Sequence, residues 1–487
     1  MFTENLANAL ALIGIVVLVA SLLSGLIERS GLPQVGIFLV LGALLGPAGL
    51  NLINLTLESP TLRIIATLAL VLVLFSDAIA MDMGEVKRQR RLALLVLGPG
   101  TLIPALLIGL AGWLLLGLAP LEATILGAAL ASTDPVLLRN LLRRPSLPPT
   151  ARVALRLESG MNDVVLLPIV VLGILVLQAG GALDPLEFGR HAVGLFILGP
   201  VLGALVGYIA ITLLEKVRSR VGVRRDYESL YALGVALTAF AAAESVGGSG
   251  FLAAFAAGIV VAAMDVELCD CFLDYGQATA EMFLLFTFVA FGAWLIWTGF
   301  SVADGRTLLF ALLALAARTL VLLPVLAQAG VAPRDRRLIA WFGPRGLSSL
   351  LLILLPVFAG MPGSVRLFEI TCLVVLLSVL LHGAAIAAFL RKDVGPGPAV
   401  TTAPARPPRE EPATPEAPIP ERITLAEMRQ LQDAGEPLVL ADVRTDRTYQ
   451  GDNLTAKGAV RLPPDDAVRR ARELGLDHHG TVVLYCA

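Results

Sequence analysis

Long apolar segments fill the first 392 residues and constrain the fold more than any other feature. A helix that crosses a membrane needs roughly 20 mostly apolar residues. Thirteen segments meet this requirement, at residues 9–27, 34–53, 61–80, 92–118, 121–142, 151–178, 192–215, 228–245, 249–265, 279–298, 305–329, 337–359 and 366–390. The sequence therefore predicts an all-α polytopic membrane protein with about 13 transmembrane helices.

The composition excludes several other classes of protein. The 487 residues are 56% hydrophobic and only 16% charged, against about 45–50% and about 25% in soluble chains. An ordinary soluble enzyme and a largely disordered chain are both excluded. A net charge of −2 gives no support for nucleic-acid binding, and four cysteines do not make a disulfide framework.

The charged residues divide the chain into a membrane part and a soluble tail. Of the 76 Lys, Arg, Asp and Glu residues, 26 fall within 393–487. In the membrane part, basic residues gather in alternate loops. With the N-terminus outside, 19 of them lie in cytoplasmic loops and 4 in the opposite loops. The positive-inside rule then predicts a cytoplasmic C-terminal tail, in a bacterial-type cytoplasmic (inner) membrane. The N-terminus has no basic region typical of a cleavable signal peptide.

A few charged side chains fall inside the predicted spans, where each costs about 2.5 kcal/mol or more. They are Asp77, Asp134, Glu158, Asp163, Glu244, Glu281, Arg318, Arg345 and Glu369, and His382 is a further polar residue there. The surplus of carboxylates favours a path for cations or protons. For Glu244, Glu281, Glu369 and His382, a satisfied contact between helices is the alternative interpretation.

Two spans contain motifs that break helices. In Thr133-Asp134-Pro135 the proline removes a backbone donor and pushes the preceding residue out of the helical region. Gly343-Pro344-Arg345-Gly346 interrupts the twelfth span in the same way. Broken helices at corresponding places in two halves indicate a midplane ion site between inverted repeats. A simple proline kink is the alternative for the first motif.

The sixth span concentrates polar side chains in Glu158-Ser159-Gly160-Met161-Asn162-Asp163. Ser159 and Asp163 are four residues apart and share one helix face. A carboxylate in a low dielectric can exchange its proton near neutral pH, and oxygen ligands suit a small hard cation. A structural hydrogen-bond cluster is the alternative.

The two intramembrane arginines need partners. An arginine inside a membrane must be paired. We expect Glu158 to pair with Arg345, and Arg318 to pair with Glu281 or Glu369.

These three motifs, in this order, resemble the NhaP-type branch of the monovalent cation:proton antiporters (the sodium/hydrogen exchanger family), over about residues 1–392. The resemblance implies an inverted-repeat fold of thirteen helices with two discontinuous helices. It also implies a homodimer in the lipid bilayer, in which a core domain moves against a dimerisation domain.

The resemblance also implies a role for each motif residue. Asp163 is the carboxylate that binds either the cation or the proton. Ser159, Asp134 and the Thr133 carbonyl complete the site. Asp77 is an acidic residue reached through water. Asn162 stands where electrogenic relatives have an aspartate, which implies electroneutral exchange, and Glu158 with Arg345 resembles the structural ion pair of the family.

The expected function is therefore secondary transport rather than enzyme catalysis. The protein would exchange Na⁺ for protons in pH and cation homeostasis, with no cofactor and no metal other than the transported Na⁺, K⁺ or Li⁺. A K⁺/H⁺ antiporter is the alternative, because Gly160-Met161 replaces the bulky pair of many members. A cation channel or potassium-efflux subunit is a further alternative, but the tail has no Gly-rich nucleotide-binding motif.

The tail divides into a linker and a small domain. Residues 393–420 contain nine of the 30 prolines, which predicts a disordered linker. Residues 421–487 resemble part of a rhodanese domain, with Asp442-Val443-Arg444 after one strand and Cys486 after another. The active-site loop would follow Ala487, so we expect no sulfur transfer. A membrane-anchored redox or sulfur sensor with Cys486 as nucleophile is the alternative, and an unreactive strand cysteine is the simplest interpretation.

Overall fold

The computed structural model describes two units of the chain separately, Met1–Gly397 and Pro398–Ala487. The described residues are 34–81, 83–142, 144, 146–179, 184–220, 225–264, 270–393, 438–444, 455–456, 458–463, 466–476 and 481–485, with isolated positions at 14, 18, 19, 22 and 428.

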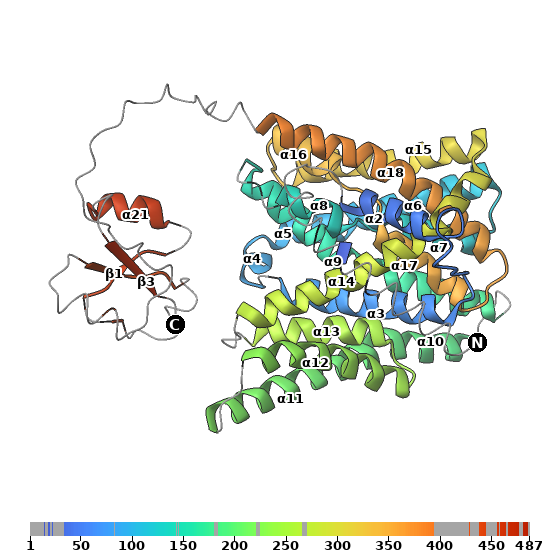
Figure 1. The fold of residues 1–487 in the computed structure, drawn as a ribbon. Coiled ribbons are helices and arrows are strands. Elements are labelled where there is room, and N and C mark those ends of the chain that lie inside the picture. The colour runs from blue at the N-terminus through green and yellow to red at the C-terminus, as the bar shows by residue number, and fades with distance from the viewer. Residues whose placement is uncertain are drawn as a thin grey trace. The chain divides into compact units, whose positions relative to one another are not determined.

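The first unit is built from helices that lie side by side (Figure 1). Its first half contains α2 (Gln34–Leu45), α3 (Pro60–Ile79), α4 (Met83–Arg88), α5 (Arg90–Leu97), α6 (Pro99–Leu116), α7 (Pro120–Ala131), α8 (Pro135–Leu142) and α9 (Pro149–Gln178). Its second half contains α10 (Pro185–Val193), the π-helical turn η1 (Gly194–Leu198), α11 (Gly199–Arg220), α12 (Arg225–Ser245), α13 (Gly250–Ala263), α14 (Asp270–Ala293), the 3₁₀ segment η2 (Leu295–Val302), α15 (Gly305–Gln328), α16 (Pro333–Trp341), α17 (Leu347–Phe358) and α18 (Ser364–Asp393).

Proline marks the beginnings of many of these helices. Pro60, Pro99, Pro120, Pro149 and Pro333 each occupy the first position of a helix. The missing N–H of proline costs nothing there, because the first turn has no carbonyl to receive it. The same residue type therefore starts helices at loops and breaks them inside spans.

The predicted spans from residue 34 onwards each coincide with one helix or with consecutive helices. Among the described residues, seven helices are long and apolar enough to cross a membrane, or eight if the bent pair of α14 and η2 is one span. Four shorter apolar helices occur in α2, α12, α13 and α17. The protein is thus a multi-pass membrane protein. The number thirteen and the inverted repeats stay predictions, and the first predicted span, 9–27, lies outside the described residues except for isolated positions.

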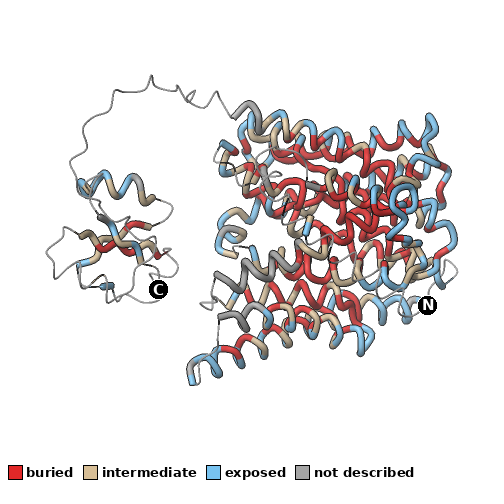
Figure 2. The backbone as a smooth tube through the Cα atoms, viewed as in Figure 1, coloured by how far each residue is buried: buried red, intermediate tan, exposed pale blue. Residues whose placement is uncertain are grey.

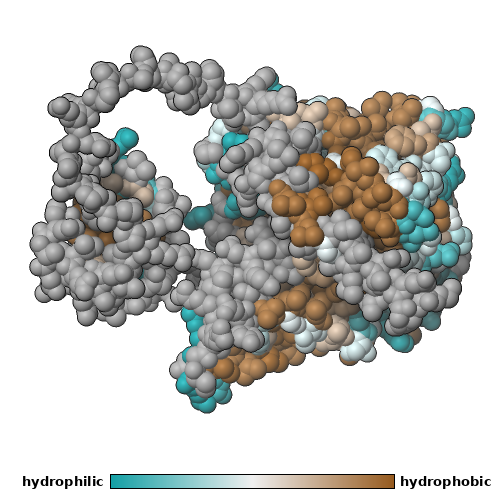
Figure 3. Space-filling model, in the orientation of Figure 1, coloured by the Kyte–Doolittle hydropathy of each residue, from teal (hydrophilic) through white to brown (hydrophobic). Residues whose placement is uncertain are grey.

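The buried core runs through the middle of the helical unit (Figure 2). Helix α9 lies at its centre and packs against α3, α5, α6, α7, α8, α16 and α17. Large apolar side chains are exposed on the outside, including Leu106 and Leu114 of α6 and Val201 of α11. Apolar residues cover much of the visible face (Figure 3). A lipid environment explains why so many apolar side chains face outwards.

One end of the helical unit carries exposed basic residues from two distant helices. Helices α4 and α16 lie at one end and α10 at the other (Figure 1). The first end carries exposed Lys87 and Arg88 on α4 and exposed Arg334 and Arg337 on α16. The structure thus brings basic segments far apart in sequence to one end. The orientation of that end towards the cytoplasm stays a prediction.

The second unit contains a small parallel sheet. Strands β1 (Leu438–Asp442), β2 (Val460–Arg461) and β3 (Thr481–Tyr485) lie in the order β2-β1-β3, with β1 parallel to both neighbours. The short helix α21 (Ala467–Glu473) precedes β3. Both strands predicted in the tail are present. The predicted linker and Cys486 lie outside the described residues, and the rhodanese resemblance stays a prediction.

Asp442 is fixed at the end of β1 by its neighbours. Its carboxylate accepts hydrogen bonds from the Arg444 guanidinium, with 2.6 Å between Nη2 and Oδ2, and from the Arg444 backbone amide at 3.1 Å. These contacts, above all those of the guanidinium, lower the pKa of the Asp442 carboxyl below its ordinary value.

Candidate functional site

Two helix breaks meet in the core of the first unit. Helix α7 ends at Ala131 and α8 begins at Pro135, while α16 ends at Trp341 and α17 begins at Leu347. The extended segments touch, because the Asp134 amide donates a hydrogen bond to the Pro344 carbonyl at 2.9 Å. The breaks that the two proline motifs predict are therefore confirmed, and they lie against each other.

The Asp134 carboxylate joins the starts of two half-helices. Its Oδ1 accepts from the Val136 amide of α8, and its Oδ2 accepts from the Leu347 amide of α17, both at 2.8 Å. The N-terminus of a helix carries a partial positive charge. One buried carboxylate, 1% exposed, therefore neutralises two positive helix ends at once.

Arg345 stabilises the opposite end of the first break. Its Nη1 donates to the Ala131 and Ser132 carbonyls at 2.5 and 3.0 Å, where α7 ends with a partial negative charge. The Arg345 backbone amide donates to the Ser378 hydroxyl of α18 at 2.7 Å. Arg345 is 1% exposed, so water cannot solvate its charge. The carbonyls at the end of α7 compensate that charge instead.

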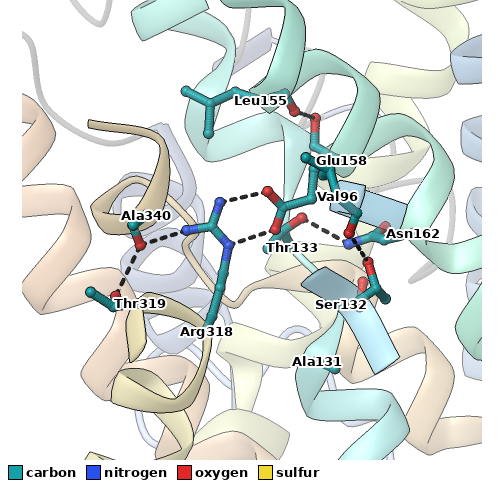
Figure 4. Close-up of polar contacts among 12 residues, drawn as sticks. Val96, Ala131, Ser132, Thr133, Leu155, Glu158, Asn162, Arg318, Thr319 and Ala340 are labelled. Carbon is teal, nitrogen blue, oxygen red and sulfur yellow. Dashed lines mark hydrogen bonds and ion pairs between the residues drawn. The ribbon is translucent and has the colours of Figure 1, made fainter. Parts of the chain in front are cut away.

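Arg318 of α15, rather than Arg345, forms the buried ion pair with Glu158 (Figure 4). Its Nε and Nη2 donate to the two Glu158 carboxylate oxygens at 2.5 and 2.6 Å, and its Nη1 donates to the Ala340 carbonyl at 2.7 Å. The predicted pairing of Glu158 with Arg345 is wrong, because the Arg345 guanidinium is held by the carbonyls of α7.

The partners predicted for Arg318 are also corrected. Its guanidinium is fully engaged by Glu158 and by the end of α16 at Ala340, where a cation offsets the negative helix end. Glu369 is half-buried on α18, and the Glu281 side chain lies outside the described residues. Arg318 thus donates to a carbonyl at the C-terminal end of α16, as Arg345 does at the C-terminal end of α7.

Asp163 lies beside the crossing of the two breaks. The Ser132 hydroxyl donates to Asp163 Oδ1 at 2.5 Å, and the Ser348 side chain lies close to the same carboxylate. Asp163 is 4% exposed. Neither serine was predicted as a site residue from the sequence, although Ser132 directly precedes the first break motif and Ser348 lies two residues after the second.

Asn162 connects α9 to the first break. Its Nδ2 donates to the Thr133 hydroxyl at 2.7 Å (Figure 4), whereas the analysis of the sequence assigned the Thr133 carbonyl to the site. Within the described residues, the buried Oδ1 of Asn162 has no hydrogen-bond partner. The Ser159 hydroxyl donates to the Leu155 carbonyl of its own helix at 2.8 Å. Ser159 is therefore near Asp163 in the chain but does not donate to it.

Asp77 and Glu244 are two further charged residues that were predicted to lie inside the spans. Asp77 is half-buried on α3 and faces α9, since a Cβ added to Gly160 would lie 3.8 Å from the Asp77 Cβ. Asp77 is thus next to the helical turn that precedes Asp163. Glu244 is exposed at the end of α12 and accepts from the Gly250 amide at 2.9 Å. It fastens the turn between α12 and α13, which agrees with the satisfied contact between helices that was the alternative interpretation of this residue.

The polar oxygens around Asp163 suit a small cation better than a resident metal. Within the residues that the structure describes, no group of three or more His, Cys, Asp or Glu side chains is placed to hold a metal ion. Asp163 is surrounded by hydroxyl and amide groups instead. Such hard oxygen ligands bind alkali and alkaline-earth cations rather than soft metals.

Comparisons with known proteins give relatives over the same part of the chain. The K(+)/H(+) antiporter NhaP of Alkalimonas amylolytica is 27% identical over 403 residues, which cover 80% of this chain and 67% of that protein. The K(+)/H(+) antiporter NhaP2 of Shewanella oneidensis is 28% identical over 392 residues, covering 79% and 67%. The Na(+)/H(+) antiporter NhaG of Bacillus atrophaeus is 26% identical over 207 residues, covering 40% and 37%.

The fold is shared with a solved structure. The sodium proton antiporter MjNhaP1 from Methanocaldococcus jannaschii superimposes with a TM-score of 0.64, at 20% sequence identity, over 78% of this chain and 99% of that one. Residues 14–392 match the family described as "Sodium/hydrogen exchanger, transmembrane". This match spans all the helices that meet at the two breaks, and the chain therefore belongs to the sodium/hydrogen exchanger family.

Proposed function

We propose that Asp163 is the carboxylate at which this monovalent cation/proton antiporter binds its cation and its proton in turn. Three carboxylates are buried around the two breaks. Glu158 is neutralised by Arg318, and Asp134 by two helix N-termini. Asp163 instead lies against hydroxyl groups, which can turn their lone pairs towards a cation. This difference in partners is the observation that carries the proposal.

The proposed cation ligands are oxygens around Asp163. The Ser132 hydroxyl already donates to its carboxylate and Ser348 lies close to it, and the hydrogen-bonded pair of Asn162 and Thr133 is proposed to supply further oxygens. Ser159 is proposed as an additional hydroxyl ligand. Asp134 acts by holding the two breaks together, and Asp77 is proposed as the acidic residue through which a cation approaches.

Competition at one carboxylate couples the two fluxes. Asp163 holds either a proton or a cation, so each side of the membrane loads one or the other, and alternating access exchanges them without ATP. Because Asn162 is neutral, one carboxylate remains to exchange one proton for one monovalent cation. We therefore propose electroneutral exchange. In proteoliposomes, an imposed membrane potential should leave the initial exchange rate unchanged, and a rate that follows the potential would contradict this stoichiometry.

We propose Na⁺ as the transported cation, with K⁺ as the second candidate. The hydroxyl and carboxylate oxygens at Ser132 and Asp163 are hard ligands, which favour a small hard cation. The relatives whose alignment covers about four fifths of this chain are named K(+)/H(+) antiporters. Their names favour K⁺, the larger of the two cations. Adding Na⁺, K⁺ or Li⁺ separately to proteoliposomes with a pH gradient, and comparing the half-saturating concentrations, separates the two proposals.

Replacing Gly346 should damage the site through Asp134. A Cβ at Gly346 would overlap the Asp134 carboxylate, which then cannot accept from both half-helix amides. We expect Gly346→Ala to raise the half-saturating cation concentration at least tenfold, the ratio that about 1.4 kcal/mol produces. Gly234→Ala on α12, outside the site, is the matched control, because its Cβ would meet no other atom within 4 Å. Equal kinetics for the two variants would contradict the role of Asp134.

The assembly is proposed from the family resemblance. We propose a homodimer with the N-terminus outside and the tail in the cytoplasm of an inner membrane. The gathering of basic residues at the end that contains α4 and α16 supports this orientation (Figure 1). Labelling of single cysteines introduced at Arg88 or Arg190 by a membrane-impermeant reagent tests it, since only the second should react in intact cells. For the tail, the parallel sheet supports a rhodanese-like fold.

A further inference from the structure

A groove opens between α15 and α16, on the outside of the helical unit. It has a volume of about 470 Å³ and is lined by Thr319, Leu323, Arg334, Arg337, Leu338, Trp341 and Phe342. This volume lies within the range of about 300–1,000 Å³ that is usual for ligand sites. None of these residues belongs to the cation site around Asp163.

The side chains of α16 divide the groove into a charged and an apolar part. Arg334, Leu338 and Trp341 are separated by four and three residues and therefore share one helix face, with Arg337 beside them. The two arginines are exposed in the first turns of α16, whereas Leu338 is half-buried and Trp341 is 42% exposed further along. Leu323 of α15 forms the facing wall. Two cations thus stand at the end of an apolar channel.

This arrangement fits an anionic phospholipid, and we propose that the groove binds one from the adjacent leaflet. Guanidinium groups bind phosphate with paired hydrogen bonds. Basic pockets between membrane helices are suited to anionic lipid head groups. The phosphate would lie on Arg334 and Arg337, and an acyl chain would pass over Leu323, Leu338 and Trp341.

The position of the groove connects it to the second helix break. Trp341 is the last residue of α16, and Phe342 begins the extended segment. Thr319 donates to the Ala340 carbonyl at 2.9 Å, the same carbonyl that receives Arg318 Nη1. A lipid in the groove would therefore brace the end of α16 from outside, opposite the Glu158–Arg318 pair. The bound lipid should stabilise the folded protein.

The test is a thermal unfolding titration of the purified full chain in detergent. Added phosphatidylglycerol should raise the unfolding temperature, whereas phosphatidylcholine and inorganic phosphate should not. The double variant Arg334→Gln/Arg337→Gln should bind phosphatidylglycerol roughly 30-fold more weakly, which corresponds to about 1 kcal/mol for each arginine near the membrane surface. The control Lys87→Gln/Arg88→Gln removes two exposed cations from α4 and should bind as the unaltered protein does.

A second, independent variant fills the apolar part of the groove between α15 and α16. Leu323→Trp places bulk in the groove without changing charge, and it should also weaken phosphatidylglycerol binding. The unfolding temperature of each variant without lipid shows whether it folds. Equal weakening by the α4 control would overturn the proposal in favour of general surface charge. Equal protection by phosphate alone, or by phosphatidylcholine, would overturn it as well. The readout is binding, so it does not depend on the proposed cation site.

Discussion

We expect Asp163→Asn to abolish cation-driven proton flux for both Na⁺ and K⁺, down to the level of empty liposomes, and to leave the amount of folded protein unchanged. The amide has nearly the same shape as the carboxylate, so Ser132 can still donate to its oxygen as it does to Asp163 Oδ1. The amide cannot bind and release a proton or offer a negative charge to a cation. Dissipation of a pH gradient after cation addition to proteoliposomes measures the loss.

The matched control is another aspartate-to-asparagine change outside the site. Asp304 caps α15 by accepting from the Thr307 amide at 2.7 Å, and asparagine caps helices about equally well. Asp304→Asn should therefore exchange cations as the unaltered protein does. In the unaltered protein, lowering the pH should raise the half-saturating cation concentration, because protons compete for Asp163. Exchange that survives Asp163→Asn would refute the assignment of this carboxylate.

The positions of the helix breaks followed from local chemistry. Pro135 and Pro344 disturb the backbone wherever they occur inside an apolar segment, so the interruptions after Ala131 and Trp341 were predictable. The facing of the two breaks was also expected, because two broken helices in corresponding places indicate a shared site. What the sequence did not contain was Asp134 capping both α8 and α17, which depends on how the segments cross.

The pairing of the two arginines could not be derived from the sequence. Glu158 and Arg318 are 160 residues apart, and spacing does not decide between Arg318 and Arg345 as its partner. The decision depends on α15, which presents Arg318 to both Glu158 and Ala340. Arg345 finds its partners in the carbonyls of Ala131 and Ser132, a kind of partner that a search for opposite charges overlooks.

Helix periodicity alone does not predict which serine hydroxyl contacts Asp163. The four-residue spacing placed Ser159 on the same face as Asp163, but a serine inside a helix can donate to the carbonyl four residues earlier. Ser159 does so at Leu155. Ser132 lies just beyond the end of α7, and its hydroxyl donates to Asp163 instead. Serines at a break are thus better site candidates than serines within a turn.

Breaking the Glu158–Arg318 ion pair should also have a large effect. It should lower the amount of folded protein and not only the rate of transport. Arg318→Met leaves the Glu158 carboxylate buried without its cation, and removing one partner of a buried pair costs about 3–5 kcal/mol. We expect a marked loss of folded protein, measured by size-exclusion chromatography of detergent extracts. Arg156→Met is the control, because Arg156 is exposed on α9, two residues before Glu158, and its loss should leave the yield unchanged.

The double variant distinguishes an ion pair from two independent contributions. Replacing a buried pair by apolar residues of similar volume is often nearly neutral, so Glu158→Met combined with Arg318→Met should restore much of the yield that Arg318→Met loses. The same Glu158→Met change should not rescue Arg345→Met, which leaves the Ala131 and Ser132 carbonyls without their donor. If Glu158→Met rescued Arg345→Met but not Arg318→Met, Arg345 would be the partner of Glu158, and the pairing described above would be contradicted.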